Sequence, residues 1–115
     1  MIEKLTILRE SDVINENAFG FAVKAYEEAK KYSESEEKIN MFITHLAMAT
    51  MRIIRGDIVE ADAEELKTSV KLEVGEKVFA LVDELWNKMK KHSPIVFPDS
   101  EDAFIYLHLC NVFNE

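Results

Sequence analysis

Two histidines in this sequence are placed so that their side chains could do chemistry together with a charged neighbour. His45 is followed seven residues later by Arg52, and His108 is preceded seven residues earlier by Glu101. Seven residues make about two helical turns, so each pair shares one face of a helix. An arginine can bind an added phosphate by charge-assisted hydrogen bonds, and a carboxylate can fix the tautomer of an imidazole.

The residue types alone leave three interpretations of His45 and His108 open. A histidine on a mixed helix face is commonly a hydrogen-bonded structural residue. The two histidines and Glu101 could instead form a metal site with two histidines and one carboxylate, although no local His-x-x-x-His or Glu-x-x-His spacing supports it. The third interpretation is that a neutral imidazole accepts a phosphoryl group. We expect His92, the third histidine, to be exposed and without function, and we predict no metal or other cofactor.

The last helix, predicted to follow an N-cap at Asp99 and to run to Phe113, is the element around which the rest must pack. Pro98 ends the preceding segment, and Asp99 with Asp102 has the spacing of a capping box. The residues that follow are apolar on nearly every side, so this helix belongs at the centre of a bundle or beneath a partner.

Helical spacing of apolar residues predicts further helices. The first spans residues 13–32 and is capped by Ser11 or Asp12; the second spans residues 36–55, has a capping box of Ser33 and Glu36 or a cap at Ser35, and ends at Gly56. A short third helix follows over residues 63–70 and is capped by Asp62. A longer fourth helix spans residues 72–91, and Gly75 suggests that it starts a few residues later. Residues 92–98 form an extended linker. Residues 1–11 have no clear pattern, so we expect one helical domain over residues 12–115.

The second predicted helix has two different faces. One face is core, and its members are Ile39, Phe42, Ile43, Leu46, Ala49, Thr50 and Ile53. The other face is semi-polar and contains Met41, His45, Met48 and Arg52. Arg52 and Arg55 both fall in the last turn, where the helix dipole favours cations.

Composition limits the functions that this chain can have. It contains 115 residues with 3 Gly and 2 Pro, which favours a mostly helical fold. Its 14 Lys+Arg against 22 Asp+Glu give a formal charge of -8, which argues against direct binding to nucleic acid. The single Cys110 excludes an internal disulfide and fits a reducing compartment. With no visible signal peptide or membrane-length apolar run, we expect a soluble cytoplasmic protein.

Two motifs resemble the PTS regulation domain (PRD) of bacterial antiterminators and transcription activators. Residues 45–52 read His-Leu-Ala-Met-Ala-Thr-Met-Arg, similar to a family helix with a histidine followed by Ile, Phe and Ala and then by an arginine. Residues 98–109 read Pro-Asp-Ser-Glu-Asp-Ala-Phe-Ile-Tyr-Leu-His-Leu, similar to a last helix with Asp-Glu, apolar residues and His-Leu. The resemblance covers about residues 12–113. Thr44 stands where the family has Asp, Met48 replaces Phe, and Ser100 stands where Asp is frequent.

The resemblance implies an all-α bundle of five helices. In this family the first and fourth helices are antiparallel, the second and fifth are antiparallel, and the third is short. It also implies that phosphocarrier proteins of the sugar phosphotransferase system phosphorylate His45 and His108, with Arg52, Arg55 and Glu101 as their neighbours.

The resemblance further implies a regulatory protein and not an enzyme. Phosphorylation would change the packing of a homodimer and the binding of an unknown regulatory target, without direct contact with nucleic acid or membrane. The chain looks like a stand-alone PRD. The alternative is a helical scaffold subunit that keeps the fold without the phosphorylation switch.

Overall fold

The computed structural model describes residues 2–113, which form six α-helices and no strand. The helices are α1 (Ile2–Glu10), α2 (Glu16–Lys30), α3 (Glu36–Ile54), α4 (Ala63–Val74), α5 (Glu76–Lys90) and α6 (Asp99–Phe113). The predicted all-α class is confirmed, but the prediction of five helices is wrong. The additional helix, α1, lies in the N-terminal segment whose structure the sequence left undecided.

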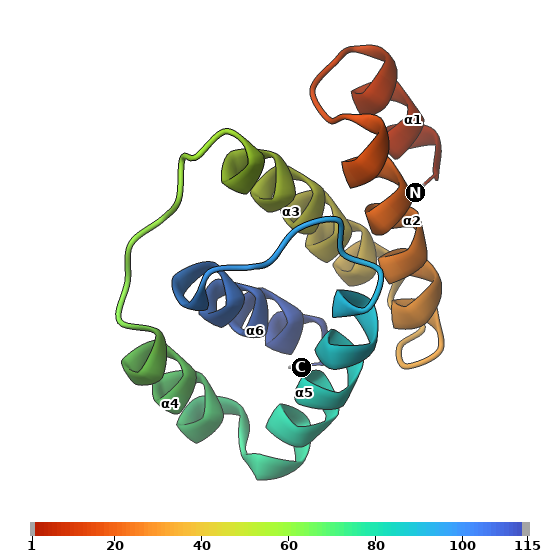
Figure 1. Ribbon diagram of the computed structural model, residues 1–115. Coiled ribbons are helices and arrows are strands. Elements are labelled where there is room, and N and C mark those ends of the chain that lie inside the picture. Colours follow the sequence, from red (N-terminus) through yellow and green to blue (C-terminus); the bar gives the residue numbers. More distant parts are fainter. Residues whose placement is uncertain (1, 114–115) are drawn as a thin grey trace.

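The last helix lies at the centre of the bundle. Figure 1 shows α6 between α3, α4 and α5, with α2 packed on the outer side of α3 and α5 and α1 packed on α2. This position explains why apolar residues occur all round α6, since three helices of the same chain cover it. Its buried residues are Glu101, Asp102, Ala103, Ile105, Tyr106, Leu109, Cys110 and Val112.

Helices α3 and α6 are antiparallel, as the family resemblance implied. His45 in the middle of α3 stacks on His108 near the end of α6, and Arg52 near the end of α3 pairs with Glu101 near the start of α6. Helices α2 and α5 run in broadly opposite directions and also pack together, with Phe21 against Trp86.

The connections correct several predicted helix ends. α2 is capped by Asn15, whose Oδ1 accepts a hydrogen bond from the Ala18 amide at 2.8 Å. Ser11 and Asp12 therefore do not cap it; they belong to the turn after α1, where Asp12 has a φ of 61°. Because this turn ends one helix before Asn15 begins the next, the cap lies three or four residues later than predicted.

The starts of α3 and α5 also differ from the sequence prediction, whereas the start of α4 agrees with it. Ser35 is the N-cap of α3 but makes no side-chain capping bond, and the Glu36 carboxylate accepts from the Tyr26 hydroxyl at 2.7 Å in place of closing a capping box. Asp62 caps α4 as predicted, accepting from the Glu65 amide at 3.1 Å. Gly75, at a φ of 90°, separates α4 from α5, so α5 begins later than residue 72.

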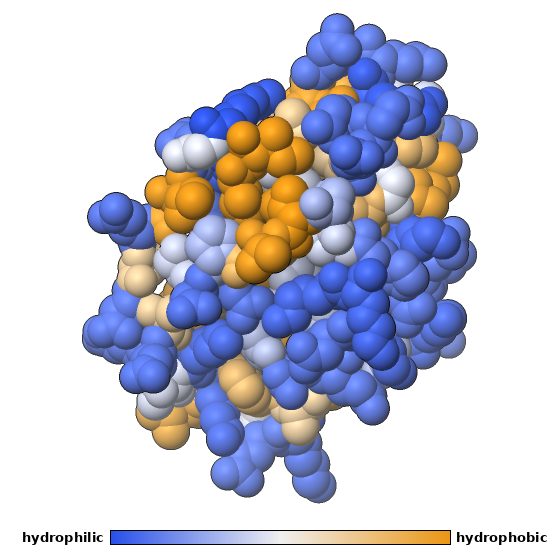
Figure 2. Space-filling model, in the orientation of Figure 1, coloured by the Kyte–Doolittle hydropathy of each residue, from blue (hydrophilic) through white to orange (hydrophobic). Residues whose placement is uncertain are grey.

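A hydrophobic patch lies on the surface over the C-terminal half of α3 and the connections beside it (Figure 2). The exposed large apolar residues of these segments are Ile54, Ile58, Val59 and Val96. Among residues 2–113, no helix has both the length and the apolar character needed to cross a membrane.

Candidate functional site

The two histidines singled out by the sequence lie face to face. The His45 ring of α3 and the His108 ring of α6 stack with centroids 4.6 Å apart and an interplanar angle of 9°. His45 is exposed, whereas His108 is half-buried. Antiparallel packing of the two helices therefore brings together two imidazoles of different accessibility.

Arg52 and Glu101 form an ion pair about two helical turns away from the histidines. Arg52 Nη2 donates to Glu101 Oε1 at 2.9 Å, and the amide of Val59 donates to Glu101 Oε2 at 3.2 Å. Glu101 is fully buried, while the Arg52 side chain is 38% exposed and its buried Nε has no hydrogen-bond partner. Both Glu101 oxygens face Arg52 and the segment after α3, so this carboxylate does not fix the tautomer of either imidazole.

A cavity of about 390 Å³ connects the ion pair with the histidine pair. Its mixed lining gives a phosphate-sized anion one guanidinium and two imidazoles to contact, beside one carboxylate. The lining residues are His45, Ala49, Arg52, Val59, Glu101, Phe104, Ile105 and His108.

The surroundings of His108 keep its ring neutral at neutral pH. Burial lowers the pKa of His108, and the neighbouring His45 and the Arg52 guanidinium lower it further. A neutral imidazole has a free electron pair on one ring nitrogen, which is what a phosphoacceptor or a metal ligand requires.

Two sequence predictions concern residues outside this cavity. Arg55 is exposed at the end of α3 and does not line the cavity, so the structure does not bring it to the histidines. His92 is exposed in the turn after α5, as expected. Within residues 2–113, no group of three or more His, Cys, Asp or Glu side chains is arranged to hold a metal ion.

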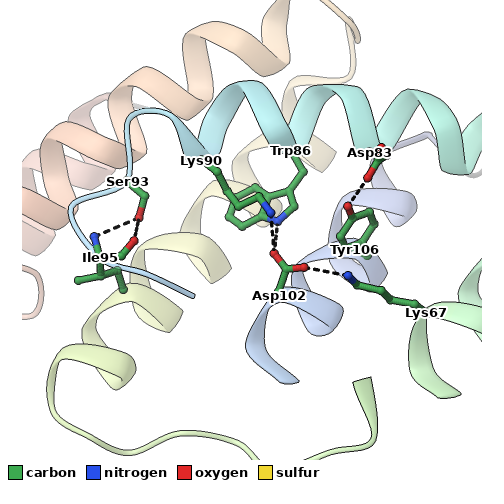
Figure 3. A network of polar contacts seen from close by, with 8 residues as sticks. All are labelled: Lys67, Asp83, Trp86, Lys90, Ser93, Ile95, Asp102 and Tyr106. Carbon is green, nitrogen blue, oxygen red and sulfur yellow. Dashed lines mark hydrogen bonds and ion pairs between the residues drawn. The ribbon is translucent and has the colours of Figure 1, made fainter. Parts of the chain in front are cut away.

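Asp102, directly after Glu101, anchors a second polar network that the sequence did not reveal. Its Oδ1 accepts from Trp86 Nε1 at 2.6 Å and from Lys90 Nζ at 3.2 Å, and its Oδ2 pairs with Lys67 Nζ at 3.0 Å (Figure 3). Asp102 was predicted to close a capping box with Asp99, but these contacts tie α6 to α4 and α5 instead. The available signal was Trp86 and Lys90, four residues apart on one helix face.

Burial and hydrogen bonding act in opposite directions on Asp102. Burial raises the pKa of its carboxyl, but the hydrogen bonds from Trp86, Lys67 and Lys90 outweigh burial, and the net pKa is lowered. Asp102 is therefore a charged structural anchor.

Two further groups on α6 are structural. Burial and the hydrogen bond that its hydroxyl donates to Asp83 raise the pKa of Tyr106. Burial, with a contribution from Glu73, raises the pKa of Cys110 to about 11, so this buried thiol is protonated at neutral pH.

Comparison with known families identifies the family to which this helical chain belongs. The model of the PRD domain matches residues 21–112, which include α3 to α6 and most of α2. The chain belongs to the PRD family. The stacked His45 and His108 thus lie within a PRD, whereas α1 precedes the matched region. No curated protein and no solved structure matches the chain.

Proposed function

We propose that this PRD is a regulatory module whose paired histidines accept phosphoryl groups from phosphocarrier proteins of the sugar phosphotransferase system. The observation that carries the proposal is the stack of His45 on His108 beside a cavity that also contains Arg52. PRD domains are known for such phosphorylation, and here the histidines face an opening with a guanidinium to bind the product. In this role the protein is a substrate of the phosphocarriers, acting in the cytoplasm, and is not itself an enzyme.

The reaction moves one phosphoryl group between two imidazoles. A neutral ring nitrogen of His45 or His108 attacks the phosphorus of a phosphohistidine on the donor, forming one N–P bond while the donor N–P bond breaks. The electron pair of the broken bond stays on the donor nitrogen. One proton passes, net, from the accepting imidazole to the donor imidazole, so both rings are neutral afterwards.

Arg52 links the new phosphate to the rest of the fold. A phosphate of roughly -1.5 to -2 charges at neutral pH competes with Glu101 for the guanidinium. When Arg52 turns to the phosphate, Glu101 loses its cation and the Val59 amide loses a well-held acceptor. The segment between α3 and α4 then rearranges, and we propose this as the way phosphorylation changes the protein surface.

We propose that this surface meets a second copy of the chain and a regulatory target protein. Because α3, α4 and α5 already cover α6, the proposed homodimer rests on exposed apolar residues such as Met41, 60% exposed beside His45, and the patch around Ile54 and Ile58. Phosphorylation near such a surface adds like charges to both copies, which shifts the dimer equilibrium. The charge of -8 favours a protein target over nucleic acid.

Phosphoenolpyruvate and the two general phosphocarrier proteins test the proposal directly. Mass spectrometry under alkaline conditions, where phosphohistidine survives, should find phosphate on the wild-type chain. His45→Ala and His108→Ala should each remove the phosphate carried at the substituted position, and His92→Ala is the matched control because His92 is exposed and lies away from the cavity. Absence of phosphate from both His45 and His108 would leave the scaffold interpretation in place of the switch.

The dimer is tested separately by light scattering at micromolar and higher concentrations. We expect a dimer mass for the unmodified chain and a changed dimer fraction after phosphorylation. A monomer mass throughout this range contradicts the proposed homodimer without affecting the phosphorylation result.

A further inference from the structure

His45 lies where three surface cavities meet. It lines the 390 Å³ cavity toward Glu101, a second cavity of about 270 Å³ toward the end of α6, and a third, shallower depression of about 530 Å³ between α3 and α1. His108 lines the first and second cavities but not the third. Of the residues lining these three cavities, His45 is the one common to all.

Each of the three cavities also has one basic side chain in its lining. Arg52 lines the first, Lys38 lines the second, and Lys4 from α1 lines the third. The carboxylates among the lining residues are Glu101, which is bonded to Arg52 and the Val59 amide, and Glu37 beside Lys4. In a chain of net charge -8, three cations around one exposed imidazole favour an anion there.

Accessibility separates the two histidines further. Phosphoryl transfer requires the accepting nitrogen to come within about 3–3.5 Å of the donor's phosphorus, in line with the bond that breaks. A donor protein can reach the exposed His45 without rearrangement, whereas His108 is half-buried beneath it. The stacked His108 ring supports the His45 ring from its inner side.

We propose, on the basis of the phosphorylation proposed above, that His45 carries the phosphoryl group and that Lys4, Lys38 and Arg52 bind it. The product has a dianionic phosphate at the junction of the three cavities, each of which has one of these cations in its lining. Lys4 gives α1 a role that the family match does not include, because α1 precedes residue 21, where the match begins.

Binding of the phosphate by Lys4 couples modification to the N-terminal helix. α1 is nine residues long, buries Leu5 as its anchor, and packs on α2. A short helix held by so few buried side chains opens locally at low cost. A phosphate on His45 adds an ionic contact between α3 and α1, so it should slow hydrogen exchange of the α1 amides.

The test measures phosphate occupancy at each histidine at equilibrium with a fixed ratio of phosphorylated to free general phosphocarrier. Alkaline peptide mapping separates the peptides that contain His45 and His108. Lys4→Gln and Lys38→Gln should each lower the ratio of phosphorylated to free His45 by about two- to five-fold, the range typical of exposed ion pairs. Lys24→Gln is the matched control, because Lys24 is an exposed lysine of α2 that lines none of the three cavities.

The outcomes separate this inference from the proposed function. Phosphate on His45, lowered occupancy in the Lys4 and Lys38 variants, and phosphate-dependent protection of α1 that Lys4→Gln abolishes would support it. Phosphate found on His108 and not on His45, or Lys4 and Lys38 variants that match Lys24→Gln, would overturn it while the phosphorylation proposal stands. Absence of phosphate from both histidines overturns the proposed function and this inference together.

Discussion

Glu101 and Asp102 are adjacent carboxylates on α6 with opposite surroundings. Asp102 points toward α4 and α5, where an indole and two lysines satisfy it. Glu101 points toward α3, where it holds one partly exposed arginine and the amide of Val59 in a connecting segment. Both are buried, and the cations that hold them, Arg52, Lys67 and Lys90, are similarly exposed; the difference is that Asp102 also accepts from the fully buried Trp86 indole.

The difference indicates which side of α6 is rigid and which can switch. The Trp86 indole is fully buried and has no route to water, so its bond to Asp102 is maintained. Arg52 is 38% exposed, lies beside the histidine cavity and has a spare Nε–H, so an anion entering the cavity can compete for it. We infer that Asp102 holds α6 against α4 and α5, whereas the Glu101–Arg52 pair changes when an anion binds in the cavity.

The largest effect on stability is expected from Asp102→Ala. The substitution leaves the buried Trp86 N–H without an acceptor and removes the partner of Lys67 and Lys90, so we expect a loss of about 3 kcal/mol. For a domain of this size this loss corresponds to a fall in Tm of roughly 10 °C. Urea and thermal unfolding followed by circular dichroism measure both values.

Asp99→Ala is the control for Asp102→Ala, since Asp99 is an exposed acid in the same helical turn. We expect it to cost under about 1 kcal/mol, the value of an acid near a helix N-terminus. Equal losses in the two variants would contradict the anchoring role of Asp102.

Sequence reasoning found the arrangement of α3 and α6 but not that of α1. The seven-residue spacings of His45 with Arg52 and of Glu101 with His108 show which residues share a helix face, and the family resemblance implied that the two helices are antiparallel. α1 buries one residue, Leu5, so its periodicity is weak. Its helical structure depends on packing against α2, which a local pattern does not contain.

The second largest effect is expected from Arg52→Met. This substitution preserves the aliphatic packing but leaves Glu101, which is fully buried, without its cation. Because the arginine is partly exposed, water can replace some of its stabilisation, and we expect a loss of about 2 kcal/mol. Urea unfolding measures it, with Arg55→Met as the control at an exposed position of the same helix end. A loss of unfolding free energy no greater than that of Arg55→Met would show that the Arg52–Glu101 ion pair does not stabilise the fold.

A smaller effect is expected from Glu101→Gln. The amide keeps an acceptor oxygen and the shape of the side chain, and Arg52 can turn to water, so we expect a loss of about 1 kcal/mol. The local consequence is larger: exchange of the Val59 amide hydrogen should become faster, as it should after phosphorylation of the wild-type chain. Hydrogen exchange followed by NMR measures this amide. Unchanged protection of Val59 in both cases would contradict the proposed path from Arg52 to the segment after α3.

The site was predictable only where its parts lie on one face of one helix. His45, Arg52, Glu101 and His108 were found by spacing, but the cavity that joins them also needs Val59 and Phe104. Lys38 lies on α3 seven residues before His45, so its position follows the same spacing as Arg52, whereas Lys4 comes from α1, which packs on α2. Asp102 was assigned to a cap because its partners, Trp86, Lys67 and Lys90, lie on other helices. Contacts between helices leave no periodic signal in the chain.

The smallest effect is expected in the pH dependence contributed by His108. Its folded pKa is lowered by burial, by His45 and by Arg52, so below the unfolded value of about 6.5 the unfolded chain binds more protons than the folded chain. Stability should therefore fall as the pH drops below about 6.5, until the lower folded pKa is passed. His45 and Arg52 both lower the pKa of His108. Glu101 is paired with Arg52 and does not offset them by stabilising the imidazolium.

His108→Asn should remove this part of the pH dependence. Urea unfolding at pH 7.5 and 5.5 should show a smaller loss of stability on acidification for His108→Asn than for the wild type. His92→Asn, at an exposed position, should keep the wild-type slope. Equal slopes for His108→Asn and the wild type would mean that the stacked ring gains a proton as readily as a free histidine. The contrast between the fixed Asp102 side and the responsive cavity side of α6 would then lose its support from the histidine pair.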